Sequence, residues 1–276
     1  MKVTQKKLYF NKYIWITAAM VFIVSVGSFL AFSNFMANIH LGLEISIQNA
    51  SFDFYPMHGY SLMQIIAPVF ASVSMLSFME IKQDFIFISP RCRSYQSYIL
   101  KKIFQYILVA CLAMYAAYLL FLFLGAAILP IHYKVDRYLF IEWTGKEFSN
   151  EHPVLYYMLE GFLRYVIFMA AYSLFAIAVS FLTQKKYLCI LIPLLYFDLG
   201  AIGEAALERL IQVITGGQLR TNLMFLAPTY TVMSNSREYI SGFAILFPLL
   251  PVLIFSLGVI IYRLYFDKRN DVYAAH

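Results

Sequence analysis

The segment Phe87–Lys102 (FISPRCRSYQSYILKK) concentrates cationic and aromatic side chains between two long apolar runs. Arg91 and Arg93 carry planar charged groups, and Tyr95 and Tyr98 carry aromatic rings with a hydroxyl group. Arginine and tyrosine are common energetic anchors of protein interfaces. The same residue types also suit a membrane surface, where they contact lipid headgroups. The segment therefore predicts either a docking surface for a protein partner or a headgroup anchor.

Two charged residues lie inside apolar runs, where an isolated charge is unfavourable. Arg164 lies within Tyr156–Thr183, and Asp198 lies within Tyr187–Gly203. A short turn joins these two runs into an antiparallel hairpin, so we expect both charges at a similar depth, roughly 8–12 Å below the outer surface. The simplest arrangement is a mutual salt bridge that clamps the two helices. The alternatives are charges that line a substrate route, or an Arg164 that snorkels to the headgroups or pairs with Glu160.

A third polar group follows the second of these runs, in a predicted extracellular helical segment within residues 204–240. It contains Glu204, Glu208 and Arg209, and the helix is expected to stop at Gly216-Gly217. Apolar and acidic residues fall largely on different faces, which is typical of an amphipathic helix. Such a helix can lie on the membrane surface, continue the preceding span, or turn back into the outer leaflet as a lid.

The elements that position these residues follow from the composition. Hydrophobic residues make up 62% of the 276 residues, charged residues only 13%, and the mean hydropathy is +0.71. This balance predicts an all-α integral membrane protein, because each crossing must satisfy its backbone hydrogen bonds within a helix of about 20 residues. The six predicted membrane-spanning runs are Tyr13–Phe35, Ser61–Met79, Ile103–Pro130, Tyr156–Thr183, Tyr187–Gly203 and Ser241–Tyr262.

The basic residues predict the orientation of these spans. Fourteen of the 21 lysines and arginines fall in one set of connections and six in the other. By the positive-inside rule, both termini are expected in the cytoplasm. The net charge of +6 is divided among short loops, so it indicates contact with anionic lipid headgroups and argues against a nucleic-acid partner.

Histidine and cysteine spacing predicts neither a metal site nor a disulfide framework. The five histidines are scattered along the chain. The three cysteines are Cys92, Cys111 and Cys189, and none falls in a predicted outer loop.

The run Glu80–Leu108 resembles the cytoplasmic loop of ABC exporter permeases of the type 2 class, especially small permeases of Gram-positive bacteria. In that family, an acidic or polar residue precedes a short coupling helix between spans two and three, and an Arg…Ser-Tyr-Lys pattern leads into the third span. The matching positions are Asp84, Phe85, Ile86, Arg91, Ser94, Tyr98 and Lys102. The resemblance implies docking of a cytoplasmic ATPase subunit on Asp84, Phe85, Arg91, Arg93, Ser94, Tyr95 and Tyr98.

The resemblance also implies a single permease domain over residues 1–276, in a bacterial cytoplasmic membrane. The chain lacks the G-x-x-x-x-G-K-[ST] motif, so we expect no ATPase activity and no bound cofactor. ATP and magnesium would be bound by the partner subunit. A second permease chain, identical or related, would complete a pathway for an amphipathic peptide, lipid or drug-like substrate.

Two other classes of function stay open. One is a non-transport membrane partner, such as a sensor or immunity subunit. The other is an intramembrane hydrolase, because Glu204, Glu208 and Arg209 resemble the acidic helix of CPBP-type metalloproteases. The hydrolase is disfavoured because adjacent glutamates and a histidine within a span are absent from the sequence.

Overall fold

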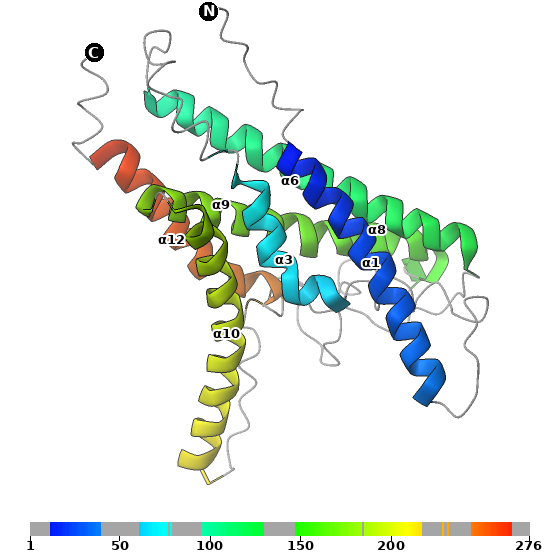
Figure 1. Cartoon of the computed structure of the whole chain (residues 1–276). Helices are drawn as coiled ribbons and strands as arrows, with labels where there is room; N and C mark the ends of the chain where they lie inside the picture. Colours follow the sequence, from blue (N-terminus) through cyan, green and yellow to red (C-terminus); the bar gives the residue numbers. More distant parts are fainter. Residues whose placement is uncertain are drawn as a thin grey trace, which may run out of the picture.

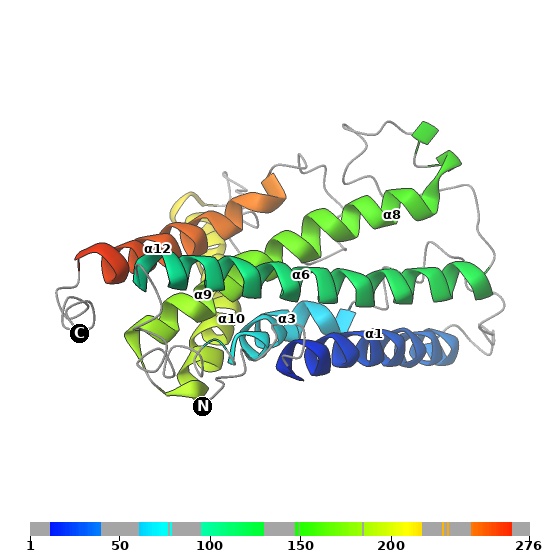
Figure 2. The same ribbon diagram turned by 90° about the horizontal axis from the view of Figure 1, so that it is seen from above.

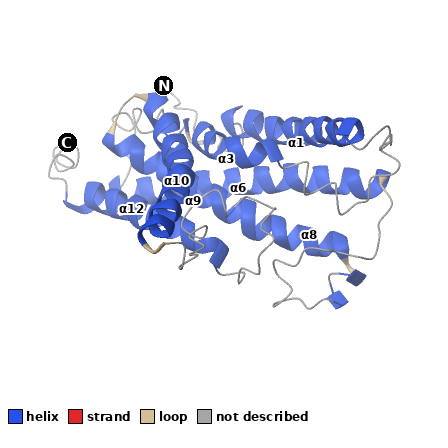
Figure 3. Ribbon diagram, turned by 90° about the horizontal axis from the view of Figure 1, so that it is seen from below, coloured by secondary structure: helices blue, strands red, loops and turns tan. Residues whose placement is uncertain are grey.

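The structure is a computed structural model that describes residues 12–39, 61–76, 78, 95–129, 147–148, 150–183, 185–216, 228, 231 and 244–266. Within these residues every regular element is a helix, as the colouring of Figure 3 shows. Four helices are uninterrupted: α1 (Lys12–Ile39), α3 (Ser61–Ser74), α6 (Tyr95–Ile128) and α10 (Lys186–Ile214).

Two further long helices, here called rods, each consist of three helical segments joined end to end. The first joins α8 (Pro153–Gly161), the π-helical turn η4 (Phe162–Val166) and α9 (Ile167–Leu182). The second joins a 3-10 turn, η6 (Ala244–Leu249), to α12 (Leu250–Ile261) and a second π-helical turn, η7 (Tyr262–Phe266). The residues at these joints keep helical backbone angles, so each rod runs on without a break.

Five helical segments are long and apolar enough to cross a membrane: Lys12–Ala31, Gln96–Ile128, Pro153–Leu182, Lys186–Ile214 and Leu246–Phe266. These segments correspond to five of the six predicted spans, so the described residues agree with the prediction of a helical protein with several helices able to cross a membrane. The remaining predicted span, Ser61–Met79, contains α3. Its 14 residues cover about 21 Å, which is shorter than the roughly 30 Å hydrocarbon core.

Local hydrogen bonds explain how polar residues fit inside these helices. The hydroxyl groups of Ser25 and Ser256 each donate to the backbone carbonyl four residues earlier, at 2.7 and 2.6 Å. Ser72 does the same to the carbonyl of Pro68, at 2.8 Å. A serine that bonds to its own helix needs no partner from lipid. Pro68 lies inside α3, and its carbonyl accepts this hydrogen bond from Ser72, one turn later.

Helix α9 lies at the centre of the bundle. It packs against α3, α6, α10 and α12, while α1 packs against α3 and α6 (Figures 1 and 2). Eleven of its 16 residues are buried, and they include Ala171, Ala176 and Ala178. Small residues let neighbouring helices approach closely in a membrane, where the hydrophobic effect does not hold helices together. A helix that is apolar on all sides and buried on most of them is therefore the core of this fold.

Helix α10 departs from the bundle. Its first half packs against α3 and α9, and its second half extends away from the other helices (Figure 1). Leu207, Leu210, Val213 and Ile214 are all exposed. The helix ends where Thr215 donates its hydroxyl to the Ile211 carbonyl at 2.7 Å and Gly216 takes a positive φ of 60°. Glycine adopts this left-handed conformation without steric cost, which makes it a common helix terminator.

Candidate functional site: buried charges and a continuous helix at the basic end

The described part of the basic segment is the beginning of α6. The predicted docking residues Asp84, Phe85, Arg91, Arg93 and Ser94 lie outside the described residues. Tyr95 is the first residue of α6, and Tyr98 is a half-buried residue of its first turn. The Lys102 ammonium group lies 5.7 Å from the centre of the Tyr98 ring, within the range of a cation–π contact.

A hydrogen bond connects the beginning of α6 to η7, the last helical turn that the structure describes. The Gln96 side-chain amide donates a hydrogen bond of 3.0 Å to the backbone carbonyl of Leu264 in η7. The 34 residues of α6 span about 51 Å, so the helix is about 20 Å longer than the hydrocarbon core. One rigid element therefore connects a surface outside the lipid with the interior of the bundle.

Five of the eight described lysines and arginines lie at one end of the bundle, and the other three are Lys12, Arg164 and Arg209. The beginning of α6, the turn between α9 and α10, and η7 lie at the same end (Figures 1 and 2). This end carries Lys101, Lys102, Lys185, Lys186 and Arg263. The described acidic residues lie elsewhere: Glu147 and Glu151 precede α8, Glu160 lies within it, Asp198 lies in the middle of α10, and Glu204 and Glu208 lie on the distal part of α10.

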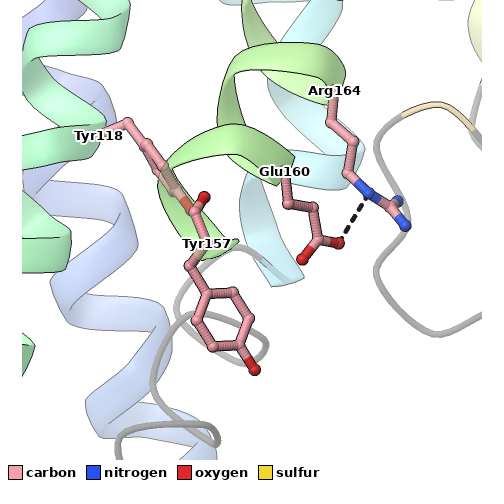
Figure 4. Close-up of polar contacts among 4 residues, drawn as sticks. All are labelled: Tyr118, Tyr157, Glu160 and Arg164. Atoms are coloured by element: carbon pink, nitrogen blue, oxygen red, sulfur yellow. Dashed lines mark hydrogen bonds and ion pairs between the residues drawn. The ribbon is translucent and has the colours of Figure 1, made fainter. Parts of the chain in front are cut away.

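A buried ion pair lies within the α8–η4–α9 rod. The Arg164 Nε atom is 2.9 Å from the Glu160 Oε1 atom, one turn earlier on the same rod (Figure 4). The Arg164 side chain is only 1% exposed and that of Glu160 is 12% exposed. Arg164 is the middle residue of the π-helical turn Phe162–Val166. Single π-helical turns inside α-helices are rare and occur frequently at functional sites.

This geometry corrects the predicted bridge between Arg164 and Asp198. The ion pair of Arg164 is formed with Glu160, which was one of the open alternatives, and the Asp198 side chain is exposed. The prediction measured depth from outer ends placed near Tyr156 and Gly203, but α10 continues to Ile214.

Measured from the turn between α9 and α10, the two charges lie at different heights. Arg164 is 18 residues before Leu182, about 27 Å, whereas Asp198 is 12 residues after Lys186, about 18 Å. The hairpin therefore places Asp198 level with residues near Tyr172, whose ring meets the edge of the Phe197 ring, next to Asp198, at 6.0 Å.

Tyrosines of α6 hold the ion-pair region in place. The Tyr118 hydroxyl donates to the Tyr157 carbonyl at 2.6 Å (both residues are drawn in Figure 4). The Tyr115 hydroxyl donates to the Met158 carbonyl at 3.0 Å. The Tyr118 ring also lies against Gly161, where a side chain would collide with it. Sequence reasoning missed this contact, because the i, i+4 spacing marks the partner of Arg164 but no local pattern links Tyr118 to a glycine 43 positions away.

The predicted extracellular residues Glu204, Glu208 and Arg209 belong to the distal part of α10. Up to Ile214 the chain continues the preceding span as one helix, so of the three open arrangements the structure shows continuation for these residues. Glu204 and Glu208 are one turn apart and half-buried, while Arg209 is exposed. In the part of the chain that the structure describes, no cluster of three metal-ligating side chains includes them.

Comparison with known proteins assigns no family to this chain. Neither a protein-family model, nor a curated protein, nor a solved structure matches it.

Proposed function

We propose that this chain is the membrane-spanning permease subunit of an ABC exporter in a bacterial cytoplasmic membrane. It has six spans, both termini lie in the cytoplasm, and ATP is hydrolysed by a separate subunit. A second permease chain completes the pathway, and the substrate is amphipathic. The resemblance of Glu80–Leu108 to the coupling region of these permeases gives the proposal its specificity.

The unbroken course of α6 from Tyr95 to Ile128 is the structural observation that best supports this proposal. An ATPase that binds at residues 84–98 would push or pull on the first turn of a helix that continues through the lipid. Because Ile99, Ile103 and Tyr106 are buried against the bundle, movement of this end is passed to neighbouring helices. The Gln96–Leu264 hydrogen bond couples the same end to η7.

The gathering of five described basic residues at one end of the bundle supports the proposed orientation in the membrane. Lys101, Lys102, Lys185, Lys186 and Arg263 share one end of the bundle, and this is the end that the positive-inside rule assigns to the cytoplasm. With this orientation, Tyr98 and the preceding basic segment face the compartment that contains ATP.

Affinity purification of the full-length chain from its native membrane tests the proposal. We expect co-purification of a protein that carries a G-x-x-x-x-G-K-[ST] motif and hydrolyses ATP. Arg91→Glu and Tyr98→Ala should each weaken this association at least tenfold, because loss of an interface anchor typically costs about 2 kcal/mol or more. Arg209→Glu, at the opposite end, is the matched control.

Two results would contradict the proposed function or the proposed docking surface. If the wild-type chain is folded and purifies without any ATP-binding protein, the permease assignment is wrong, and a non-transport membrane partner becomes the better description. If the ATPase is present but both variants retain it at full affinity, then the basic segment is a headgroup anchor and docking occurs elsewhere.

A further inference from the structure

Asp198 is an exposed carboxylate in the middle of a candidate membrane span. It lies 12 residues after Lys186, which corresponds to about 18 Å along the helix axis. With Lys186 at one headgroup layer, this distance places Asp198 near the midplane of a hydrocarbon core about 30 Å thick. Ionisable residues at this depth are rare, and they face a partner or a water-filled route rather than lipid.

The positive charges of the described residues lie away from this carboxylate or are already engaged. Arg164 pairs with Glu160. Lys186 and Arg209, on the same helix, are 12 residues before and 11 residues after Asp198, which corresponds to about 18 and 16 Å. Within the described part of the chain, Asp198 therefore forms no salt bridge, so the described residues provide no cation for its carboxylate.

Two polar groups on α9 lie near the level of Asp198. The hydroxyl groups of Tyr172 and Ser173 are buried, and neither has a hydrogen-bond partner among the described residues. Ser173 differs in this from Ser180 on the same helix, whose hydroxyl donates to the Ile177 carbonyl at 2.6 Å. Buried hydroxyl groups normally have partners, so the absence of one among the described residues is unusual.

The Tyr172 ring is fixed by aromatic neighbours. It stacks on Phe168 with ring centres 4.3 Å apart, and it meets the edge of Phe197, the residue before Asp198, at 6.0 Å. These ring contacts pack α9 against α10 directly beside Asp198.

Exposed apolar side chains flank Asp198 on α10. Leu195, Leu199 and Ile202, one turn before, beside and one turn after Asp198, are 45%, 60% and 64% exposed. A negative charge surrounded by exposed aliphatic side chains at midplane depth complements a molecule with a positive charge on an apolar body.

We propose that Asp198 recognises the cationic group of an amphipathic substrate, such as an organic amine or phosphonium. The apolar part of the substrate lies on Leu195, Leu199 and Ile202. The substrate assignment rests on the proposed transport function, but binding itself requires neither the ATPase subunit nor ATP hydrolysis.

Binding of tetraphenylphosphonium to the full-length chain in nanodiscs of uncharged lipid is the decisive measurement. We expect Asp198→Asn to weaken binding about tenfold or more, because a charge-assisted contact is lost. Asp198→Glu should retain most of the affinity. Glu208→Gln, a carboxylate farther along the same helix, should leave it unchanged, and neutral triphenylphosphine oxide should bind wild type and Asp198→Asn equally weakly.

Three outcomes would overturn the proposal. The first is equal binding of tetraphenylphosphonium by wild type and a correctly folded Asp198→Asn variant. The second is displacement of the probe by millimolar sodium or potassium, which would assign the carboxylate to an inorganic cation. The third is unchanged binding together with a change from dimer to monomer, which would place Asp198 in a contact between two copies. Co-purification of the ATPase is a separate readout, so the proposed function can fail while this site stands.

Discussion

The Tyr118 ring of α6 lies directly over the backbone of Gly161, and its hydroxyl group donates to the Tyr157 carbonyl one turn earlier. A single tyrosine thus covers a glycine and binds the preceding turn of the neighbouring helix. This contact holds the end of α8 against α6 just before the π-helical turn that carries Arg164.

Gly161→Ala tests this contact. The added methyl group would overlap the Tyr118 ring, so the substitution should lower the free energy of unfolding by about 1–3 kcal/mol, the usual cost of overpacking. Gly258→Ala in α12 is the matched control, because a methyl group there meets nothing within 4 Å. Thermal unfolding in detergent measures both. If the two variants melt at the same temperature, Tyr118 does not lie where we describe it.

The Glu160–Arg164 pair predicts strong thermodynamic coupling within one rod. Glu160→Gln or Arg164→Gln alone leaves a charge in the protein interior, which costs about 3–5 kcal/mol for a buried pair. The double variant should be more stable than the sum of the single effects predicts, because both charges are then removed.

The same cycle with Asp198 is the control for this coupling. Arg164→Gln and Asp198→Asn should be additive, because the two residues do not pair. Rescue of folding by the exchange Arg164→Asp with Asp198→Arg would contradict the structure and restore the interhelical bridge that sequence reasoning favoured.

Chemical labelling of single cysteines tests the orientation. In a background without Cys92, Cys111 and Cys189, cysteine at the exposed position Ser97 should react with a membrane-impermeant reagent only after the membrane is opened. Cysteine at exposed Arg209 should react in intact cells. The opposite pattern would invert the topology, and it would place the basic segment outside the cell, away from ATP.

The Gln96–Leu264 hydrogen bond predicts communication between α6 and η7. Gln96→Ala should cost about 1 kcal/mol of stability, the usual net value of one hydrogen bond. If α6 transmits ATPase motion, the variant should also reduce transport per ATP hydrolysed, with ATPase binding unchanged. Ser97→Ala, at the exposed neighbouring position, should alter neither quantity.

Five spans could be predicted from the sequence because each contains an apolar run long enough to cross a bilayer. An apolar run is visible within one short stretch of sequence. A contact between two helices depends on residues far apart in the sequence, as the wrongly predicted Arg164–Asp198 salt bridge shows. The prediction places the outer membrane surface near Gly203, but α10 continues to Ile214 as one helix, and Asp198 and Arg164 lie at different heights when both are measured from the turn between α9 and α10.

The ion-pair region shows the same limit. The spacing of Glu160 and Arg164 is readable in the sequence as i, i+4, so this pair was among the alternatives. The π-helical turn around Arg164 and the closure of Tyr118 over Gly161 depend on the packing of α6 against α8. Neither has a signature in the residues themselves.

Pro193 lies inside the packed first half of α10, one turn before Phe197, which is buried against Phe168 and Tyr172 of α9. A proline removes one backbone hydrogen bond and makes bending easier at its position. Ile214 lies 21 residues beyond it, about 32 Å along the axis, so a tilt of about 10° at Pro193 would sweep the tip of the helix through about 5–6 Å. Small rearrangements of the backbone at Pro193, within the membrane, would therefore become displacements of several ångströms at the far end of α10.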